Sequence, residues 1–511
     1  MTTDDPAPSA TVFFDRDFGT LSDLIALHAR IQPDKQALVG EDAILDYASL
    51  DQAMDRIAAT LQTRSIAKGT PVAMVGSNSA ALATLFLGIL RAGCVPTPIA
   101  PSSTPDQIAA MVADCGSPML FADDESHAAL MNASLSVPLL KLAELDAWAN
   151  AASPPVAVEI VPDDPFNIIY SSGTTGTPKG IVQPHSMRWA QLSRSNFTDA
   201  VTMIATPLYS NTTLVSFLPT LAWGGTAVLM KKFDARRFLE LAEANRATHA
   251  MLVPVQYARI MALPDFDAFD LSGFVLKTCT SAPFSATLKA DVVARWPGLL
   301  VEYYGMTEGG GTTLLICNQF PEKLATVGRP IEGHDIRLID DEGVEVAPGE
   351  AGEVVGRSPA MMNGYFGRKE ASDAAIWLDA DGNRFIRHGD IGRFDEDGFL
   401  TLLDRKKDLI ISGGFNIYPS DLEAILAAHP AVADCTVVGM PSETWGETPM
   451  GFYVADAAAQ DDPAAILDWF NGRVGKTQRL SALKRVDELP RSAIGKVLKR
   501  ELRDRFQEAE A

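Results

Sequence analysis

The segment 170–180, Y-S-S-G-T-T-G-T-P-K-G, contains three glycines, five serine or threonine hydroxyls and one lysine. Small residues let backbone N–H groups approach a phosphate, hydroxyls donate hydrogen bonds to it, and Lys179 adds positive charge. The segment is not a Walker A loop, because Pro178 stands where the second glycine belongs, counted from Gly173, and Gly180 replaces the metal-binding hydroxyl. Taken alone, it fits a phosphate-binding loop and a flexible surface loop equally well.

A second stretch suited to nucleotide binding, 303–311, reads Y-Y-G-M-T-E-G-G-G. Its rings suit stacking on a base, its carboxylate suits Mg²⁺, and its four glycines permit close backbone approach. The alternative is a strand end followed by a glycine turn. Asp390 is placed to accept both hydroxyls of a ribose, and Lys496 follows a glycine at the start of a predicted helix. Solvated loop aspartates and lysines are the commoner alternative.

Alternating strands and helices must position these motifs through the first 400 residues. Helical apolar spacing covers 21–31 and 49–61, a short buried strand is predicted at 71–76, and a buried helix at 80–90. The segment 99–128 repeats the alternation as a loop, a helix and a strand. This pattern predicts an α/β fold with a largely parallel sheet.

The pattern changes near residue 400. A turn, a strand, the charged segment D-R-K-K-D at 404–408 and another strand lead into a helix predicted at 420–428. We place a domain boundary at 404–408, which divides the chain into an N-terminal domain, 1–404, and a small C-terminal α/β domain, 405–511.

Composition limits the classes of partner. The chain has 511 residues, 47% of them hydrophobic, and 65 acidic against 43 basic side chains give a net charge of −22. Such a surface repels nucleic acid and anionic lipid, so a polyanionic ligand needs a local basic or amide-rich pocket.

The apolar run at 80–90 is too short to span a membrane, and the start lacks a basic signal region. Five scattered cysteines predict neither a disulfide framework nor a zinc site, and the expected compartment is the cytoplasm.

Five stretches occur in one characteristic order. They are Y-S-S-G-T-T-G-T-P-K-G, Y-G-M-T-E, G-E-V-V-G-R-S-P-A-M-M-N-G-Y, H-G-D-I-G-R-F-D-E-D-G-F with D-R-K-K-D-L-I-I-S-G-G-F-N-I-Y-P, and P-R-S-A-I-G-K. From about residue 20 onward the chain therefore resembles the adenylate-forming superfamily, which includes acyl-CoA and aryl-CoA synthetases, adenylation domains of nonribosomal peptide synthetases and firefly luciferase. The resemblance implies a large N-terminal domain of packed α/β sheets with a small β subdomain, and a mobile, small C-terminal α/β domain.

The resemblance also assigns roles to individual residues. The implied catalytic residues are Lys496, which bridges the carboxylate and the α-phosphate, Thr307, which contacts the α-phosphate, and Glu308, which binds Mg²⁺. The residues implied to bind ATP or AMP are Ser171, Ser172, Gly173, Thr174, Thr175, Gly176, Thr177, Lys179, Ser281, Ala282, Tyr304, Gly305, Asp390 and Arg405. The implied CoA-binding residues are Ser412, Gly413, Gly414, Trp445 and Arg479, with partly buried packing as the alternative for Trp445. The implied acyl-pocket residues are Ser210, Asn211, Gly309 and Gly310, and the implied hinge is Lys407.

The implied reaction has two steps. A carboxylate attacks the α-phosphorus of ATP, and Lys496 and Mg²⁺ offset the repulsion between the two anions as an acyl-adenylate and pyrophosphate form. The C-terminal domain then rotates, removes Lys496 and brings the glycine loop 412–416 to a pantetheine tunnel, where a thiol displaces AMP. Free CoA is favoured over a fused carrier protein, because the chain ends soon after Lys496. The alternatives are an enzyme that loads a separate carrier protein and a catalytically silent nucleotide-binding relative; the presence of both Lys496 and Glu308 argues against the latter.

Departures from the family pattern concern both substrates. Ser210 stands where a histidine usually gates the acyl pocket, and T-Q-R-L at 477–480 replaces an aromatic-Lys-x-Pro sequence, which weakens the CoA assignment of Arg479. Gly309 to Gly311 predict room beside the acyl group. No Lys or Arg occurs in 205–230, so a second carboxylate has no obvious partner there. We expect an apolar monocarboxylic acid, aromatic or medium-to-long chain; the particular acid, the pathway and the oligomeric state stay open, a homodimer being one alternative.

Overall fold

A computed structural model of the chain describes residues 10–170, 179–412, 415–442, 445–456, 459, 462–492 and 495–510. The chain forms two compact units that follow its order only in part. The first unit comprises 1–324, 330–335 and 356–386, and the second comprises 325–329, 336–355 and 387–511. The segment 404–408 lies within the second unit, and its role as a domain boundary stays a prediction.

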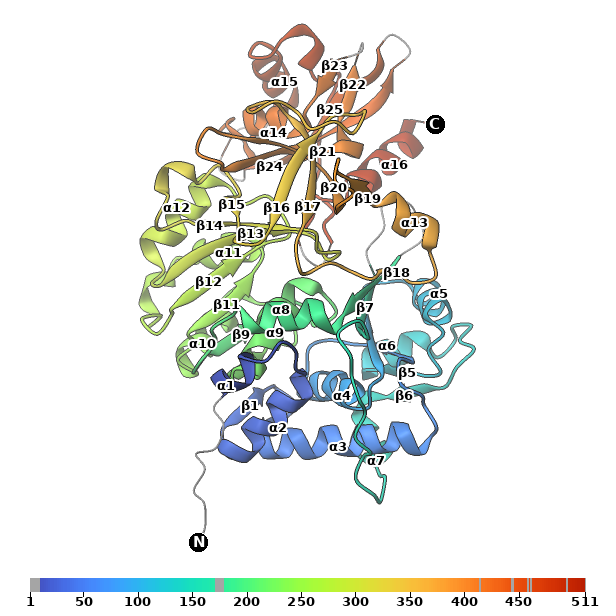
Figure 1. The fold of residues 1–511 in the computed structure, drawn as a ribbon. Coiled ribbons are helices and arrows are strands. Elements are labelled where there is room, and N and C mark those ends of the chain that lie inside the picture. Colours follow the sequence, from blue (N-terminus) through green and yellow to red (C-terminus); the bar gives the residue numbers. More distant parts are fainter. Residues whose placement is uncertain are drawn as a thin grey trace. The chain divides into compact units, whose positions relative to one another are not determined.

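A nine-stranded sheet runs through the first unit (Figure 1). Its strands lie in the order β15 (Arg329–Pro330), β14 (Thr312–Ile316), β13 (Leu299–Gly305), β12 (Leu276–Cys279), β11 (His249–Leu252), β9 (Val201–Ile204), β10 (Thr226–Leu229), β1 (Gln36–Val39) and β2 (Ile44–Asp46). From β13 to β1 all neighbours pair in parallel, whereas β14 and β2 are antiparallel to their neighbours β13 and β1. The largely parallel sheet predicted from the alternating pattern is thus confirmed.

The first unit also contains two smaller sheets. A parallel sheet has the order β4 (Val95–Ile99), β3 (Pro71–Val75), β5 (Leu120–Ala122) and β6 (Leu139–Lys141). An antiparallel sheet has the order β18 (Gly364–Tyr365), β8 (Gly180–Pro184) and β7 (Pro165–Tyr170). The segment between β7 and β8 is most of the opening motif, and its residues 171–178 lie outside the described part of the chain.

Helices cover these sheets. They are α1 (Ala10–Phe14), α2 (Leu21–Ile31), α3 (Tyr47–Thr63), α4 (Ala80–Arg91), α5 (Pro105–Cys115), α6 (Asp124–Leu130), α7 (Leu145–Trp148), α8 (His185–Ser193), α9 (Asn211–Ala222), α10 (Ala235–Ala244), α11 (Pro254–Met261), α12 (Ala286–Arg295) and α13 (Lys369–Ala374). The helices predicted at 21–31, 49–61 and 80–90 are confirmed as α2, α3 and α4.

The buried helix α4 shows how the sequence sets this core. Ser79 caps it by accepting a hydrogen bond from the backbone of Leu82, and its side chains are apolar on almost every side. Gly88 lets α4 approach α3, because a Cβ at that position would lie 2.7 Å from Cβ of Ile57. Such close packing excludes water from both helices and stabilises the unit through buried apolar area.

The second unit contains one group of strands followed by the C-terminal sheet. The first group is β16 (Asp335–Ile339), β17 (Gly352–Arg357), β20 (Arg384–Phe394) and β21 (Leu400–Arg405), and β19 (Ile376–Leu378) pairs with the start of β20 within the first unit. The C-terminal sheet has the order β23 (Phe415–Ile417), β22 (Ile410–Ser412), β25 (Gly446–Ala455) and β24 (Val432–Ser442), with β26 (Leu483–Arg485) beside β25. Its helices are α14 (Pro419–Ala427), α15 (Pro463–Asn471) and α16 (Lys499–Glu510), so the helix predicted at 420–428 is confirmed as α14.

The sequence predicted that Lys496 lies at the start of a helix, and this prediction was wrong. Helix α16 begins at Lys499, and Lys496 belongs to the turn before it. In this turn Ser492 N donates to Lys496 O at 2.8 Å and Gly495 N donates to Ser492 O at 2.8 Å. Gly495 has φ +79°, a conformation that favours glycine, so the turn fixes the backbone beside the lysine.

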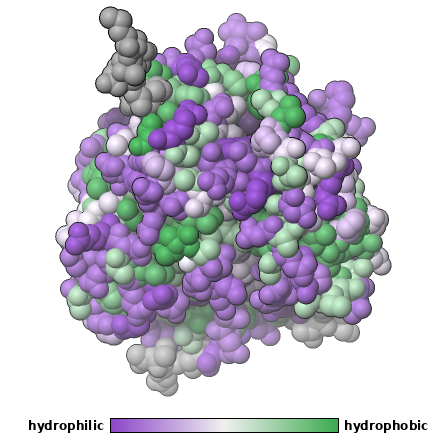
Figure 2. Space-filling model, turned by 90° about the horizontal axis from the view of Figure 1, so that it is seen from below, coloured by the Kyte–Doolittle hydropathy of each residue, from purple (hydrophilic) through white to green (hydrophobic). Residues whose placement is uncertain are grey.

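Apolar surface is broken up on the face drawn in Figure 2, where hydrophobic side chains form separate patches among hydrophilic ones. Among the described residues, no helix combines the length and the apolar character that crossing a membrane requires.

Candidate active site

Two neighbouring strands of the large sheet bring four of the expected nucleotide contacts to one edge. Tyr304 and Gly305 end β13, and Ser281 and Ala282 follow β12, which pairs with β13 in parallel. Parallel strands present their carboxyl ends at the same edge of a sheet, which is where α/β folds bind ligands. Ser281 has φ +82°, and its Oγ lies 2.6 Å from Oγ1 of Thr212. The nucleotide roles of these residues stay predictions, but the strand ends do place them together.

A tyrosine that the sequence reasoning did not single out connects two predicted site residues. The hydroxyl of Tyr365 donates a hydrogen bond to Oε1 of Glu308 at 2.9 Å, and Nζ of Lys179 lies 5.1 Å from the centre of the Tyr365 ring. Burial and the nearby Glu308 charge raise the pKa of Tyr365, so its hydroxyl stays a donor at neutral pH. The Tyr365 hydroxyl thus orients the Glu308 carboxylate, while the Tyr365 ring lies beside the Lys179 ammonium. The signal was present, since Tyr365 ends the third of the five motifs.

Gly309 and Gly310 do not leave the room that was expected beside the acyl group. A Cβ at Gly309 would lie 2.0 Å from the Ala360 carbonyl oxygen, and one at Gly310 would lie 2.7 Å from Cβ of Ile386. Gly309 and Gly310 also have φ of +79° and +82°. The prediction of empty space at these two positions was wrong, because the segment around Ala360 packs against the turn and fills it. Here glycine permits backbone contact and a left-handed turn.

The carbonyl of Thr307 is hydrogen-bonded to a group of connected polar residues, most of them buried. We call Asn167, Gln183, Arg188 and Asn211 the Arg188 cluster. Nε2 of Gln183 donates to the Thr307 carbonyl at 2.6 Å and to Oδ1 of Asn211 at 3.3 Å. The Arg188 guanidinium donates to Oδ1 of Asn167 at 3.2 Å, to Oδ1 of Asn211 at 2.9 Å, and to Oε1 of Gln183.

The Arg188 cluster places a positive charge beside Asn211, one of the residues predicted to line the acyl pocket. The sequence argument considered only the window 205–230, whereas Arg188 comes from α8 and reaches Asn211 at the start of α9. Sequence reasoning missed this cation and Gln183 because their partners lie far away along the chain. The local signal was weak: two long polar side chains, Gln183 and Arg188, at positions that the structure shows to be buried.

Ser210 has a structural contact of its own. It is the N-cap of α9, and its side chain accepts a hydrogen bond from the Thr212 backbone. The residue is buried, with 8% of its surface exposed. Its place in the acyl pocket therefore stays a prediction, whereas its cap role explains why a small hydroxyl side chain suits this position.

In the second unit, the strand pair β20–β21 carries the predicted ribose residues. Asp390 pairs in register with Arg405, and Oδ1 of Asp390 lies 2.8 Å from Nε of Arg405. Lys496 belongs to the same unit. The pKa of Lys496 is lowered to about 8, by burial first and then by the positive charges of Arg405 and Lys407, against the opposite effects of Asp390 and Asp408. Burial also lowers the pKa of Lys407.

The residues predicted to bind CoA are partly visible. Ser412 is buried in β22 and faces Gly446 of β25, while Trp445 keeps 43% of its surface exposed. An exposed indole in this position is available for stacking on a ligand ring. Arg479 is exposed and directly follows a short 3₁₀ turn, Lys476–Gln478. Gly413 and Gly414 lie outside the described residues, as do Ser171, Ser172, Gly173, Thr174, Thr175, Gly176 and Thr177 of the phosphate motif.

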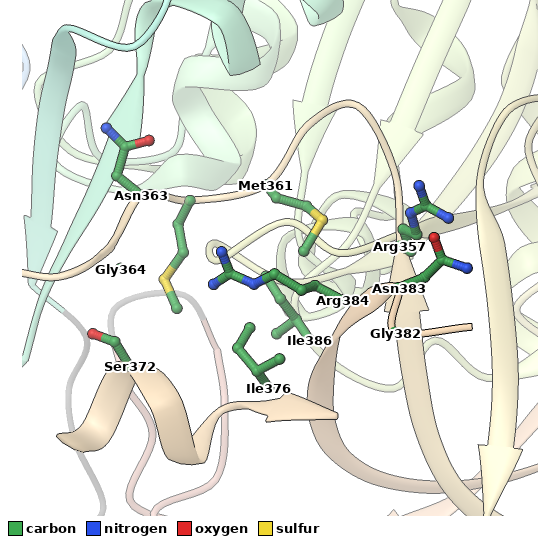
Figure 3. A pocket seen from close by; sticks show the side chains of 11 residues that line it. Arg357, Met361, Asn363, Gly364, Ser372, Ile376, Gly382, Asn383, Arg384 and Ile386 are labelled. Atoms are coloured by element: carbon green, nitrogen blue, oxygen red, sulfur yellow. The ribbon is translucent and has the colours of Figure 1, made fainter. Parts of the chain in front are cut away.

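A pocket of about 370 Å³ opens in the first unit, lined by residues between 357 and 386 (Figure 3). Arg357 and Arg384 reach into it, and Met361 and Ile386 supply apolar lining. None of the four predicted acyl-pocket residues lines this pocket.

Glu308 is suited to Mg²⁺ by its chemistry. Carboxylate oxygen is a preferred ligand of this ion, which proteins often bind through one carboxylate together with substrate phosphates. In the described part of the chain, no group of three or more His, Cys, Asp or Glu side chains forms a self-sufficient metal site. The residues present therefore fit a metal that arrives with a nucleotide.

Family comparisons agree with this arrangement of two units. A family model described as AMP-binding enzyme matches residues 25–366, and a second, AMP-binding enzyme C-terminal domain, matches residues 421–496. The chain belongs to the AMP-binding enzyme family, the adenylate-forming acid–thiol ligases, and the fold and superfamily predicted from its motifs are confirmed.

Relatives extend along nearly the whole chain. A feruloyl-CoA synthase from Amycolatopsis sp is 34% identical over 94% of this chain and 97% of that protein. A fatty acid–[acyl-carrier-protein] ligase, ScoC, from Streptomyces coeruleorubidus is 30% identical over 95% of this chain and 96% of its own length. The crystal structure of ATP-bound MatB from Rhodopseudomonas palustris superposes with a TM-score of 0.84 at 28% identity, covering 96% of this chain and 100% of that one.

Proposed function

We propose that this protein is an ATP-dependent, AMP-forming carboxylic acid:CoA ligase that uses Mg²⁺. The observation that carries the proposal is the division of its two principal charged residues between compact units: Glu308 lies in the first and Lys496 in the second. A reaction whose first step needs both groups, and whose second step needs the lysine removed, suits this division.

In the first step, the chain's own residues gather the anions. Glu308, oriented by Tyr365, is the residue that would hold Mg²⁺, which would offset charge on the ATP phosphates. Lys179 and the motif at 171–177 would hold the β- and γ-phosphates, and Lys496 would bridge the acid and the α-phosphate. An electrostatic donor of this kind contributes about 3 to 4 kcal/mol to the transition state.

In the second step, the C-terminal domain, 405–511, would turn about Lys407 and carry Lys496 away. The strand end at Ser412 and the exposed Trp445 would then serve the thiol substrate, with the indole stacking on the CoA adenine. The sulfur attacks the acyl carbonyl, AMP departs, and a thioester remains. We propose CoA as the thiol, which is the acceptor printed in the name of the feruloyl-CoA synthase relative.

We propose a mainly apolar acid, aromatic or medium-to-long chain. The names of relatives support both classes, since they include a feruloyl-CoA synthase and a long-chain-fatty-acid–CoA ligase from Mycobacterium tuberculosis. We also propose a cytoplasmic location, in keeping with the scattered cysteines, and a homodimer as the assembly to test first.

A second function, the loading of a separate acyl-carrier protein, is favoured by the resemblance to ScoC. It shares the first chemical step and differs only in the thiol.

One experiment tests the proposal against this alternative. The purified protein is incubated with ATP, Mg²⁺ and a panel of acids, with either free CoA or a phosphopantetheinylated carrier protein. We expect AMP and acyl-CoA to form with free CoA. Thioester formation on the carrier alone would replace the CoA proposal with the carrier-loading function.

A further inference from the structure

The Arg188 cluster contains a buried cation whose partners are all neutral. Arg188 has 1% of its surface exposed, and burial lowers the pKa of its guanidinium to about 9. Its side-chain acceptors are Asn167, Gln183, Gln191 and Asn211, and within the described ranges no carboxylate lies at ion-pair distance from it. A buried charge normally has an ionic partner, because removing it from water is costly.

Hydrogen bonds to Arg188 fix the direction of the amides. Oδ1 of Asn211 accepts from Arg188 at 2.9 Å and from Nε2 of Gln183 at 3.3 Å. The NH₂ group of Asn211 is therefore turned away from these two donors, since the amide oxygen and nitrogen occupy opposite sides of the side chain. Asn211 is half-buried, and the described part of the chain offers no acceptor for its NH₂ group.

The cluster as a whole has more donors than acceptors. Asn167 is fully buried, its Oδ1 accepts twice from Arg188, and its NH₂ group has no hydrogen-bond partner among the described residues. The buried NH₂ group of Asn167 thus lacks an acceptor among the described residues, the Arg188 charge lacks an ionic partner, and the NH₂ group of the half-buried Asn211 is free to donate. Buried donors without partners are rare and costly, so such a group favours a ligand that brings an acceptor oxygen.

Two contacts place Asn211 beside the expected adenylate. Gln183 joins Asn211 to the carbonyl of Thr307, and Thr212, the next residue after Asn211, joins Ser281 at 2.6 Å. The family resemblance assigns both Thr307 and Ser281 to the nucleotide, and this inference rests on the proposed function. Asn211 consequently lies where the acyl part of an acyl-adenylate would meet the protein.

We propose that Asn211, oriented by Arg188 and Gln183, determines specificity by donating a hydrogen bond to an oxygen on the acyl part of the acid. The substrate class is a mainly apolar carboxylic acid that carries a hydroxyl, alkoxy, keto or second carboxylate oxygen. Arg188 is a positioning residue: it acts through the two amides, and its positive charge strengthens the donor they present.

Asn211→Asp tests the direction of the hydrogen bond. The change is nearly isosteric, and the new carboxylate can pair with Arg188, but an acceptor oxygen replaces the NH₂ donor. The probes are acids of one skeleton: 3-phenylpropenoic acid and its ring-hydroxylated and ring-methoxylated derivatives at each position, together with a medium-chain fatty acid and its terminal dicarboxylate. Specificity constants for acyl-CoA formation are measured for each acid.

We expect the wild-type protein to favour the best oxygen-bearing acid over its unsubstituted parent by about tenfold or more, and Asn211→Asp to reduce that ratio by about five- to tenfold, in keeping with one lost hydrogen bond. Arg188→Met should reduce the same ratio, and Arg188→Lys, which keeps the charge, should restore part of it. Asn196→Asp, the same change at an exposed asparagine of the first unit, should leave the ratio unaltered.

The outcomes of this experiment distinguish the specificity role of Asn211 from the proposed ligase function. If thioesters form but the unsubstituted acids are preferred, or if Asn211→Asp leaves the ratio unchanged, the specificity role is wrong while the ligase function stands. If the ratio changes only for the dicarboxylate, the cluster selects an anion rather than a neutral oxygen. If no acid gives a CoA thioester, the proposed function itself fails.

Discussion

The protonation of Lys496 should limit adenylation at alkaline pH. In the proposed mechanism Lys496 is a cation between two anions, so activity should be present below its pKa and lost as pH rises through it. Its pKa is lowered to about 8, by burial first and then by Arg405 and Lys407. The charged fraction then falls from about nine-tenths at pH 7 to about one-tenth at pH 9, which predicts a roughly eightfold to tenfold fall in the adenylation rate constant. A lysine with an ordinary pKa would stay almost fully charged over that range.

Pyrophosphate release in the absence of CoA measures this step. Its specificity constant for the acid, followed from pH 6.5 to 9.5, reports the pKa of the free enzyme. Lys407→Gln removes a cation that lowers the pKa of Lys496, so the alkaline fall should move to higher pH. Lys476→Gln, the same change at an exposed lysine of the second unit, should leave it in place. A flat profile to pH 9.5, or a fall that moves to lower pH in Lys407→Gln, would refute the reasoning.

Other substitutions test the remaining assignments. Lys496→Ala should reduce adenylation by about a hundredfold or more and leave thioester formation from preformed acyl-adenylate nearly intact; equal losses in the two half-reactions would remove its bridging role. Lys407→Pro should spare adenylation and slow CoA transfer, as seen by single-turnover kinetics, whereas an unchanged second step would exclude it as the hinge. Lys289→Met should lower the free energy of unfolding by about 3 to 5 kcal/mol, measured with urea, because it strands the buried carboxylate of Glu302. The double variant Lys289→Met/Glu302→Leu should recover much of that loss, and no recovery would show that packing rather than charge is at stake.

The framework of the fold was predictable because it depends on local periodicity. The apolar run at 80–90 predicts a buried helix, and α4 spans Ala80–Arg91; the short apolar stretch before it predicts a strand, and β3 spans Pro71–Val75. The turn at Lys496 was not predictable in the same way. Its conformation depends on Gly495 and on the Ser492 hydrogen bonds.

The candidate site was predictable where a motif is contiguous and not where it is assembled from distant elements. Glu308 stands out beside its glycines, but its partner Tyr365 comes from β18. Arg188 meets Asn211 across 23 residues of chain, and the glycine turn is filled by residues some fifty positions later. Sequence spacing carries no record of such contacts, so neither the cation beside Asn211 nor the filled glycine turn could be predicted from it.

The central claim is that this protein joins a carboxylic acid to CoA through an acyl-adenylate. Incubation with acid and ATP labelled in the α-phosphate, first without and then with CoA, tests it most directly. The account predicts a labelled acyl-adenylate and pyrophosphate in the first stage, and labelled AMP with an equal amount of acyl-CoA in the second. Labelled ADP in place of AMP, or acyl-adenylate that persists unchanged after CoA is added, would contradict it.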